Sequence, residues 1–155
     1  MKNYQQKDVQ DEHDNKLHAE SVTKYMAKDL ITFKPDTPII DAVNTFLKKK
    51  ITGAPVLNDN NEVVGLIDDK DCLRLLVDSL YYNEPRSGGT VAQYMSNVMK
   101  TISIDSDIVD VTNIFLTTPF KRLLVVDGDG KLRGQISRHD VLRAVQNMQS
   151  TTWHK

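Results

Sequence analysis

The sequence has little of several features that would assign it to a particular class of protein. Cys72 is the only cysteine in 155 residues, which excludes an intrachain disulfide and leads us to expect a cytoplasmic protein. No hydrophobic run approaches the length of a membrane span, and the polar start of the chain lacks the apolar centre of a signal peptide. The formal net charge of −1 gives no bulk attraction to polyanions, so we expect neither a nucleic-acid partner nor a membrane partner.

The patterns that catalysis or metal binding usually requires are missing as well. The sequence contains no Cys/His dyad, no spacing typical of metal ligands and no glycine-rich phosphate loop. His13 and His18 have no cysteine or further histidine nearby, so solvated surface explains them better than a metal site does. We therefore expect a protein that is not an enzyme and that carries no metal or cofactor.

What the sequence does contain is an internal duplication. When the chain is shifted by 69 residues, sixteen positions between Val22 and Arg74 are identical to their partners between Val91 and Arg143, without a gap. Such a repeat outweighs any local pattern in deciding the fold. We divide the chain into a flexible polar tail at 1–17, a first repeat at 18–80, a loop at 81–90, a second repeat at 91–149 and a C-terminal tail at 150–155.

The sequence pattern of each repeat predicts the same order of elements: a short helix, a short strand, an amphipathic helix, two paired strands and a final helix. A unit of about 55 residues buries too little surface to be stable alone, so we expect the two repeats to pack into one α+β domain. The expected strands are 31–33, 54–57 and 63–67 in the first repeat, and 101–104, 123–126 and 132–136 in the second.

The amphipathic helix of the first repeat has a predicted start and a predicted buried face. We expect Thr37 to be its N-cap, with Pro38 at the first helical position, where a missing N–H costs nothing. Its apolar residues follow the spacing i, i+4, i+7 and i+8, and the second repeat has the same pattern. Both helices are therefore predicted to present one stripe to a core, which includes Leu47 and its partner Leu116.

Polar residues mark the end of the last strand and the start of the final helix in the second repeat. Ser137 and Asp140 have the spacing of an N-cap and its N3 partner in a capping box. A helix N-terminus also offers free N–H groups and the positive end of the helix dipole to an anion. The motif is therefore compatible with a cap alone, or with a site where Ser137 contacts a phosphate and Asp140 accepts from sugar hydroxyls.

Differences between the repeats favour a site in the second one. Lys121 and Arg122 directly precede a strand of the second repeat, so their charged ends can reach the mouth of a cleft. The first repeat has uncharged residues at those two positions and Asp68 in place of Ser137, and a carboxylate there would repel a phosphate. Capping explains both repeats equally, whereas only ligand binding explains why a hydroxyl and two cations occur together in the second.

The repeat resembles the CBS domain, and the pair of repeats resembles a Bateman module. The resemblance rests on the Tyr-Met pair before the first strand, the amphipathic helix, the strand at 123–127 and the strand–turn–helix motif at 134–140. It implies tandem βαββα-type repeats packed about a pseudo-twofold axis, with clefts between them and frequent pairing into homodimers. It also implies a regulatory, energy-sensing module that binds AMP, ADP, ATP or S-adenosylmethionine and signals to a protein partner in trans.

Under this resemblance the site residues are assigned one by one. Asp140 would hold the ribose, the Ser137 hydroxyl would contact the phosphate, and Lys121 and Arg122 would be the phosphate-binding cations. The same cleft would be lined by Thr37, Ala42, Ile51, Thr52 and Gln135. The alternative is a structural dimerisation module without a physiological nucleotide, in which the hydroxyl and carboxylate of the motif serve only as helix caps.

Overall fold

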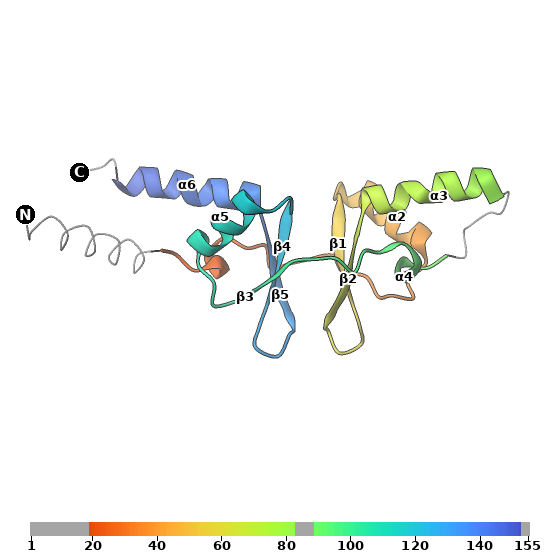
Figure 1. Cartoon of the computed structure of the whole chain (residues 1–155), viewed down its shortest axis with the longest axis horizontal. Helices are drawn as coiled ribbons and strands as arrows, with labels where there is room; N and C mark the ends of the chain where they lie inside the picture. Colours follow the sequence, from red (N-terminus) through yellow and green to blue (C-terminus); the bar gives the residue numbers. More distant parts are fainter. Residues whose placement is uncertain (1–18, 83–88, 153–155) are drawn as a thin grey trace, which may run out of the picture.

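A computed structural model describes residues 19–82 and 89–152 of the chain (Figure 1). The predicted tail at 1–17 lies outside these residues, and so do His13 and His18. Most of the predicted loop at 81–90 also lies outside them. The last helix runs to Thr152 and so includes the first residues of the tail predicted at 150–155. The helices are η1 (Val22–Lys24), α2 (Ile39–Lys49), α3 (Asp69–Tyr82), α4 (Val91–Tyr94), α5 (Ile108–Thr117) and α6 (Arg138–Thr152).

Two small sheets form two similar halves, each with a hairpin at one end and helices at the other (Figure 1). The paired strands of each half are antiparallel, and the second sheet adds one parallel strand. In the first half, Ile39, Val56 and Ile67 are fully buried between the sheet and α2. The strands are β1 (Gly53–Leu57) and β2 (Val63–Asp68) in the first sheet, and β3 (Thr101–Ser103), β4 (Arg122–Val126) and β5 (Leu132–Ser137) in the second.

The start of each repeat packs into the core of the other half. Val22 and Tyr25 belong to the core built on β4 and β5, whereas Val91 and Tyr94 belong to the core built on β1 and β2. Ala27 forms a backbone bridge with β5, and the bridge between Ser96 and β2 is its counterpart in the other half. Because each half needs a segment of the other repeat to complete its core, we expect the two halves to fold as one unit.

Contacts between equivalent positions locate the pseudo-twofold axis. Gly53 and Arg122 are separated by the repeat length, and a Cβ atom at Gly53 would collide with the Arg122 guanidinium. Glu62 and Lys131 are also equivalent, and they form a backbone bridge between the two hairpins. Two equivalent positions touch only beside the axis that relates them. The axis therefore runs from the Gly53–Arg122 contact at the helix end of the molecule to the hairpin tips.

The prediction of a strand at 31–33 is wrong, because only an isolated bridge between Phe33 and Val56 forms there. In the second half, the amide groups of Leu124 and Ile104 donate to carbonyl oxygens at 3.1 Å and 2.9 Å and so extend the parallel pairing. Their equivalents in the first half are Pro55 and Pro35, which have no N–H group to donate. The two prolines therefore remove the hydrogen bonds that would continue this pairing.

Two further expectations about the amphipathic helices are also wrong. Pro38 rather than Thr37 is the N-cap residue of α2, and the Thr37 hydroxyl accepts instead from the Lys34 amide at 3.2 Å. Leu47 and Leu116 do not face a core, because their exposed fractions are 74% and 78%. The apolar stripe of each helix thus extends beyond the side chains that are buried in the core of its own half.

Candidate functional site

The two repeats meet through a side-chain contact between predicted site residues. Arg122 lies at the start of β4, and its Nη2 donates to Thr52 Oγ1 of the first repeat at 3.0 Å. The guanidinium packs over Gly53, where the absence of a Cβ atom leaves room for it. Because this contact lies beside the pseudo-twofold axis, it places a positive charge between the two halves.

The serine and aspartate of the strand–turn–helix motif lie next to this arginine. Ser137 is the register partner of Arg122 in the β4–β5 pair, so their side chains lie on the same face of the sheet. Asp140 Oδ2 accepts from the Ser137 backbone amide at 2.8 Å and from its hydroxyl at 3.1 Å. The other oxygen, Oδ1, forms an ion pair with Arg143 at 2.8 Å. The predicted cap is therefore present, and it fixes the position of the carboxylate.

The equivalent motif of the first repeat is electrostatically different. Asp68 Oδ1 accepts from the Asp71 amide at 2.8 Å, and Asp71 Oδ2 accepts from the Asp68 amide at 3.0 Å, so the cap consists of two carboxylates. Burial raises the pKa of Asp71, and the negative charge of Asp68 raises that pKa further. Like-charge repulsion thus opposes a phosphate at this end of α3, whereas a neutral hydroxyl and an arginine occupy the corresponding place in the second half.

Most of the other predicted residues lie near this junction. Ile51 directly precedes Thr52 in the chain, and Lys121 directly precedes Arg122. The Lys121 side chain is exposed. Gln135 precedes Ser137 by two residues on β5, so it lies on the same face of the strand, and its backbone pairs with Ala27 in both directions. The structure therefore brings together residues from both repeats that are far apart in the sequence.

Two other predicted lining residues, Thr37 and Ala42, lie before and within α2. Ala42 is fully buried within the first core. Thr37 lies before the start of α2, whereas Thr52 lies just after its end, and a helix of 11 residues is about 16 Å long. The role of both residues in lining the cleft stays a prediction.

Two residues with a role at the junction were not predicted. Gly53 contributes by having no side chain, and its position opposite the arginine on the axis follows only from the packing. Arg143 pairs with Asp140 and also donates to the Tyr25 carbonyl oxygen at 3.1 Å. Arg74, the equivalent residue of the first repeat, donates in the same way to the Tyr94 carbonyl oxygen at 2.9 Å. The presence of an arginine at this position in both repeats is the sequence signal that indicates this role.

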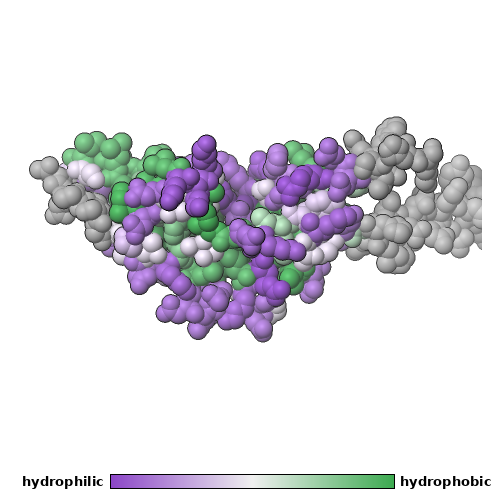
Figure 2. Space-filling view, turned by 180° about the vertical axis from the view of Figure 1, so that it is seen from behind, coloured by the Kyte–Doolittle hydropathy of each residue, from purple (hydrophilic) through white to green (hydrophobic). Residues whose placement is uncertain are grey.

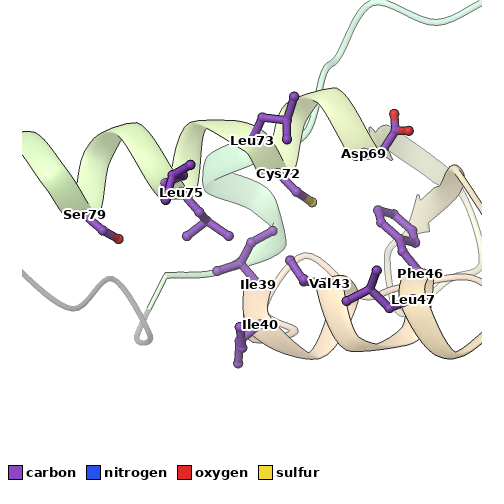
Figure 3. A pocket seen from close by; sticks show the side chains of 11 residues that line it. Ile39, Ile40, Val43, Phe46, Leu47, Asp69, Cys72, Leu73, Leu75 and Ser79 are labelled. Carbon is purple, nitrogen blue, oxygen red and sulfur yellow. The ribbon is translucent and has the colours of Figure 1, made fainter.

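A pocket with a volume of about 550 Å³ lies elsewhere, between α2 and α3 (Figure 3). Its walls are mostly apolar and include Leu47, Leu73 and Leu76, whose side chains are more than half exposed. Figure 3 shows Val43 and Leu47 rising from α2 towards α3, with Cys72 facing them. Such a surface suits apolar contact with another macromolecule better than it suits a phosphorylated ligand.

Cys72 in this pocket is expected to react slowly with alkylating agents. Burial and, to a smaller extent, the negative charges of the neighbouring aspartates together raise the pKa of its thiol to about 11. Because only the thiolate reacts, a pKa two units above the ordinary value of 9.0 lowers the rate at pH 8 by about a hundredfold, and the rate recovers only as the pH approaches 11. Iodoacetamide labelling at pH 8, with and without urea, measures this ratio, and equal rates would contradict the placement of Cys72.

Neither membrane crossing nor metal binding is indicated in residues 19–82 and 89–152. No helix there has both the length and the hydropathy that crossing a bilayer requires. No group of three or more histidine, cysteine, aspartate or glutamate side chains there is arranged to hold a metal ion.

Comparisons with known proteins agree with the duplicated architecture. The family model described as CBS domain matches residues 22–78 and again residues 91–147. The chloroplastic CBS domain-containing protein CBSX2 of Arabidopsis thaliana is 32% identical over 148 residues, which cover 81% of this chain and 62% of that protein. The uncharacterized protein MJ1225 of Methanocaldococcus jannaschii is 30% identical over 138 residues, which cover 87% of this chain and 47% of that protein. The chain thus spans less than two thirds of the length of these relatives.

Solved structures share the fold. The crystal structure of CBSX2 in complex with AMP has a TM-score of 0.73 and 33% sequence identity, and the match covers 84% of this chain and 98% of that chain. A second crystal structure, of the CBS-pair protein CBSX2 from Arabidopsis thaliana, has a TM-score of 0.74 and 31% identity, over 85% of this chain and 98% of that chain. The prediction of two tandem repeats in one α+β domain is therefore confirmed.

Proposed function

Because the chain belongs to the CBS domain family, we propose that it is a regulatory module that binds an adenosine-containing nucleotide where its two repeats meet. One observation carries the proposal: the hydrogen bond from Arg122 to Thr52, which places a cation at the junction beside Ser137 and Asp140. The complex of CBSX2 with AMP, at 33% identity, supports AMP as the first nucleotide to test.

Each residue of the junction has a role that its chemistry permits. The Asp140 carboxylate is held rigidly by Ser137 and Arg143, and a carboxylate accepts two ribose hydroxyls well. Arg122 and the exposed Lys121 would contact the phosphate. Arg122 would exchange its bond to the neutral Thr52 hydroxyl for a stronger, charge-assisted bond to an anion. Ligand binding would thereby change the contact that joins the two repeats, which a partner in trans could detect.

Thermal stabilisation by nucleotides tests this assignment. AMP at about 100 times its dissociation constant should stabilise the protein by about 2.7 kcal/mol, a shift of several degrees. Asp140→Asn should abolish most of the shift, because a neutral amide oxygen accepts ribose hydroxyls less strongly and the NH2 group that replaces the second oxygen cannot accept at all. Differential scanning fluorimetry with AMP, ADP, ATP and S-adenosylmethionine measures the effect and ranks the ligands.

The matched control is Asp71→Asn, which makes the same change at the equivalent helix start of the first repeat. It should leave most of the nucleotide-induced shift in place, and equal losses in the two variants would refute a site in the second half. Lys121→Ala should weaken AMP at least tenfold and adenosine much less, since the lost bond is to the phosphate. A uniform loss would argue against a phosphate contact.

A second candidate function, a dimerisation module, is favoured by exposed apolar side chains on the helices. We propose that two copies pair through this surface, called here the helical face. Figure 1 shows α3 and α6 along the same edge of the molecule, and Figure 2 shows apolar surface gathered over the half that carries α2 and α3. The exposed residues of the helical face are Leu47, Leu73, Leu76, Val77 and Leu80 in the first half and Val109, Leu116, Leu142, Val145 and Met148 in the second.

A further inference from the structure

A second pocket lies at the hairpin end of the molecule, away from the junction. Its volume is about 290 Å³, and Lys28, Lys131 and Arg133 all line it. Its other walls come from the segment after η1 and from the β1–β2 hairpin, and no carboxylate is among the lining residues. Side chains of one charge sign that line a cavity favour an ion of the opposite sign, so this wall favours an anion.

This pocket is separate from the proposed nucleotide site. Arg133 and Ser137 are four residues apart on β5, which corresponds to about 13 Å along a strand. The segment from Ala27 to Phe33 passes from β5 to β1, since Ala27 pairs with Gln135 and Phe33 with Val56. Lys28 and Thr32 on this segment line the hairpin-end pocket, together with Asn61 from the tip of the first hairpin.

The three cations differ in how far the protein already uses them. Lys131 donates from Nζ to the Asn60 carbonyl oxygen, which ties the two hairpins together. Arg133 makes only a long contact of 3.4 Å to Asp127, whose other oxygen accepts from the backbone amides of Asp129 and Lys131. Lys28 makes no hydrogen bond or ion pair with any of the described residues, and its side chain is exposed. Lys28 is therefore available to a ligand, and Arg133 could exchange its long contact with Asp127 for a shorter one with a bound anion.

The pseudo-twofold symmetry shows that a hairpin and its crossing segment form without these charges. The positions equivalent to Lys28, Lys131 and Arg133 in the other half are Asn97, Glu62 and Val64. The other half thus forms the same hairpin and the same crossing segment with no cation at these three places. A structural role common to both halves does not explain a cluster that only one of them has.

We propose that this hairpin-end pocket binds a small phosphate-type polyanion, such as pyrophosphate or a terminal phosphate group, through Lys28 and Arg133 with support from Lys131. The volume lies at the lower end of the range for small-molecule sites, which suits a compact anion better than a nucleoside. The guanidinium of Arg133 can bind two oxygens of one phosphate, and the lysine ammonium adds a point charge.

Titration of the full chain with sodium pyrophosphate at constant ionic strength, followed by 15N NMR, tests the proposal. Saturable shifts are expected at the amides of Lys28, Asn61 and Arg133. The double variant Lys28→Ser/Arg133→Ser should bind at least tenfold more weakly, because both exposed cations are lost. The control, Lys48→Ser/Lys49→Ser, removes the same charge from the end of α2 and should bind as the wild type does.

Three results would overturn the proposal: no saturable shift at this pocket, an equal loss in the control variant, or shifts confined to Arg122 and Ser137 at the junction. The outcome is independent of the proposed function, because Lys28→Ser/Arg133→Ser should keep the stabilisation by AMP unchanged. If AMP fails to bind the wild type but pyrophosphate shifts this pocket, the nucleotide proposal fails and the anion site stands.

Discussion

Replacing Gly134 by alanine is expected to destabilise the protein by about 1–3 kcal/mol, the usual cost of forcing an extra methyl group into a tightly packed place. A Cβ atom at this position of β5 would lie 2.6 Å from the Met26 sulfur and 2.9 Å from the Ala27 carbonyl oxygen. The thioether is flexible and can move, but the carbonyl belongs to a segment whose backbone pairs with Gln135 in both directions. Urea denaturation monitored by circular dichroism measures the loss.

Two other glycines provide a graded control. At Gly128 a Cβ atom would meet nothing within 4 Å, so alanine there should change the stability by less than about 0.5 kcal/mol. At Gly65, the equivalent of Gly134, the Met95 sulfur is 2.5 Å away but the nearest backbone atom, the Ser96 carbonyl oxygen, is 3.2 Å away. The expected order of loss is Gly134, then Gly65, then Gly128. A cost at Gly128 equal to that at Gly134 would contradict the close packing of the crossing segment.

The repeat and the local patterns predicted most of the elements but not how the repeats exchange their first segments. Paired strands, turns and helices depend on nearby residues, so periodicity and turn composition were sufficient for them. The Tyr-Met pair is present in both repeats, yet its place in the opposite core depends on contacts between distant residues such as Tyr25 and Arg143. The absent strand at 31–33 was predictable in principle, because Pro35 and Pro55 are visible in the sequence.

The candidate site was predicted best where it follows from one strand–turn–helix motif. Ser137 and Asp140 are neighbours through the backbone geometry of a helix start, so their contact follows from sequence spacing alone. Thr37 and Ala42 were assigned by resemblance alone, and their role stays a prediction, because the burial of Ala42 and the position of Thr37 before α2 do not by themselves define a ligand contact. Helical periodicity also identified the apolar stripes, but it indicates only which face is apolar and not whether the same chain covers it.

Substituting lysine for Leu76 and Leu142 is expected to convert a dimer into a monomer. These side chains lie on the helical face with exposed fractions of 67% and 62%, so lysine there should leave the cores of the monomer intact. Within the proposed dimer both leucines would be buried in each copy, and placing charges there should raise the dissociation constant by about a hundredfold or more. Light scattering after size exclusion should give a mass near 17.6 kDa for the variant and twice that for the wild type.

The control for this experiment is Val98→Lys, which replaces an apolar side chain that is 77% exposed but lies outside the helices. This variant should remain dimeric, because exposure alone does not place a residue in the interface. Circular dichroism of all three proteins would verify that the helices persist. A wild-type mass near 17.6 kDa over the accessible concentration range would refute self-association, and so would an equal loss of dimer in the control. Because the helical face and the junction use different residues, nucleotide binding to the monomeric variant would show whether the site is complete within one chain.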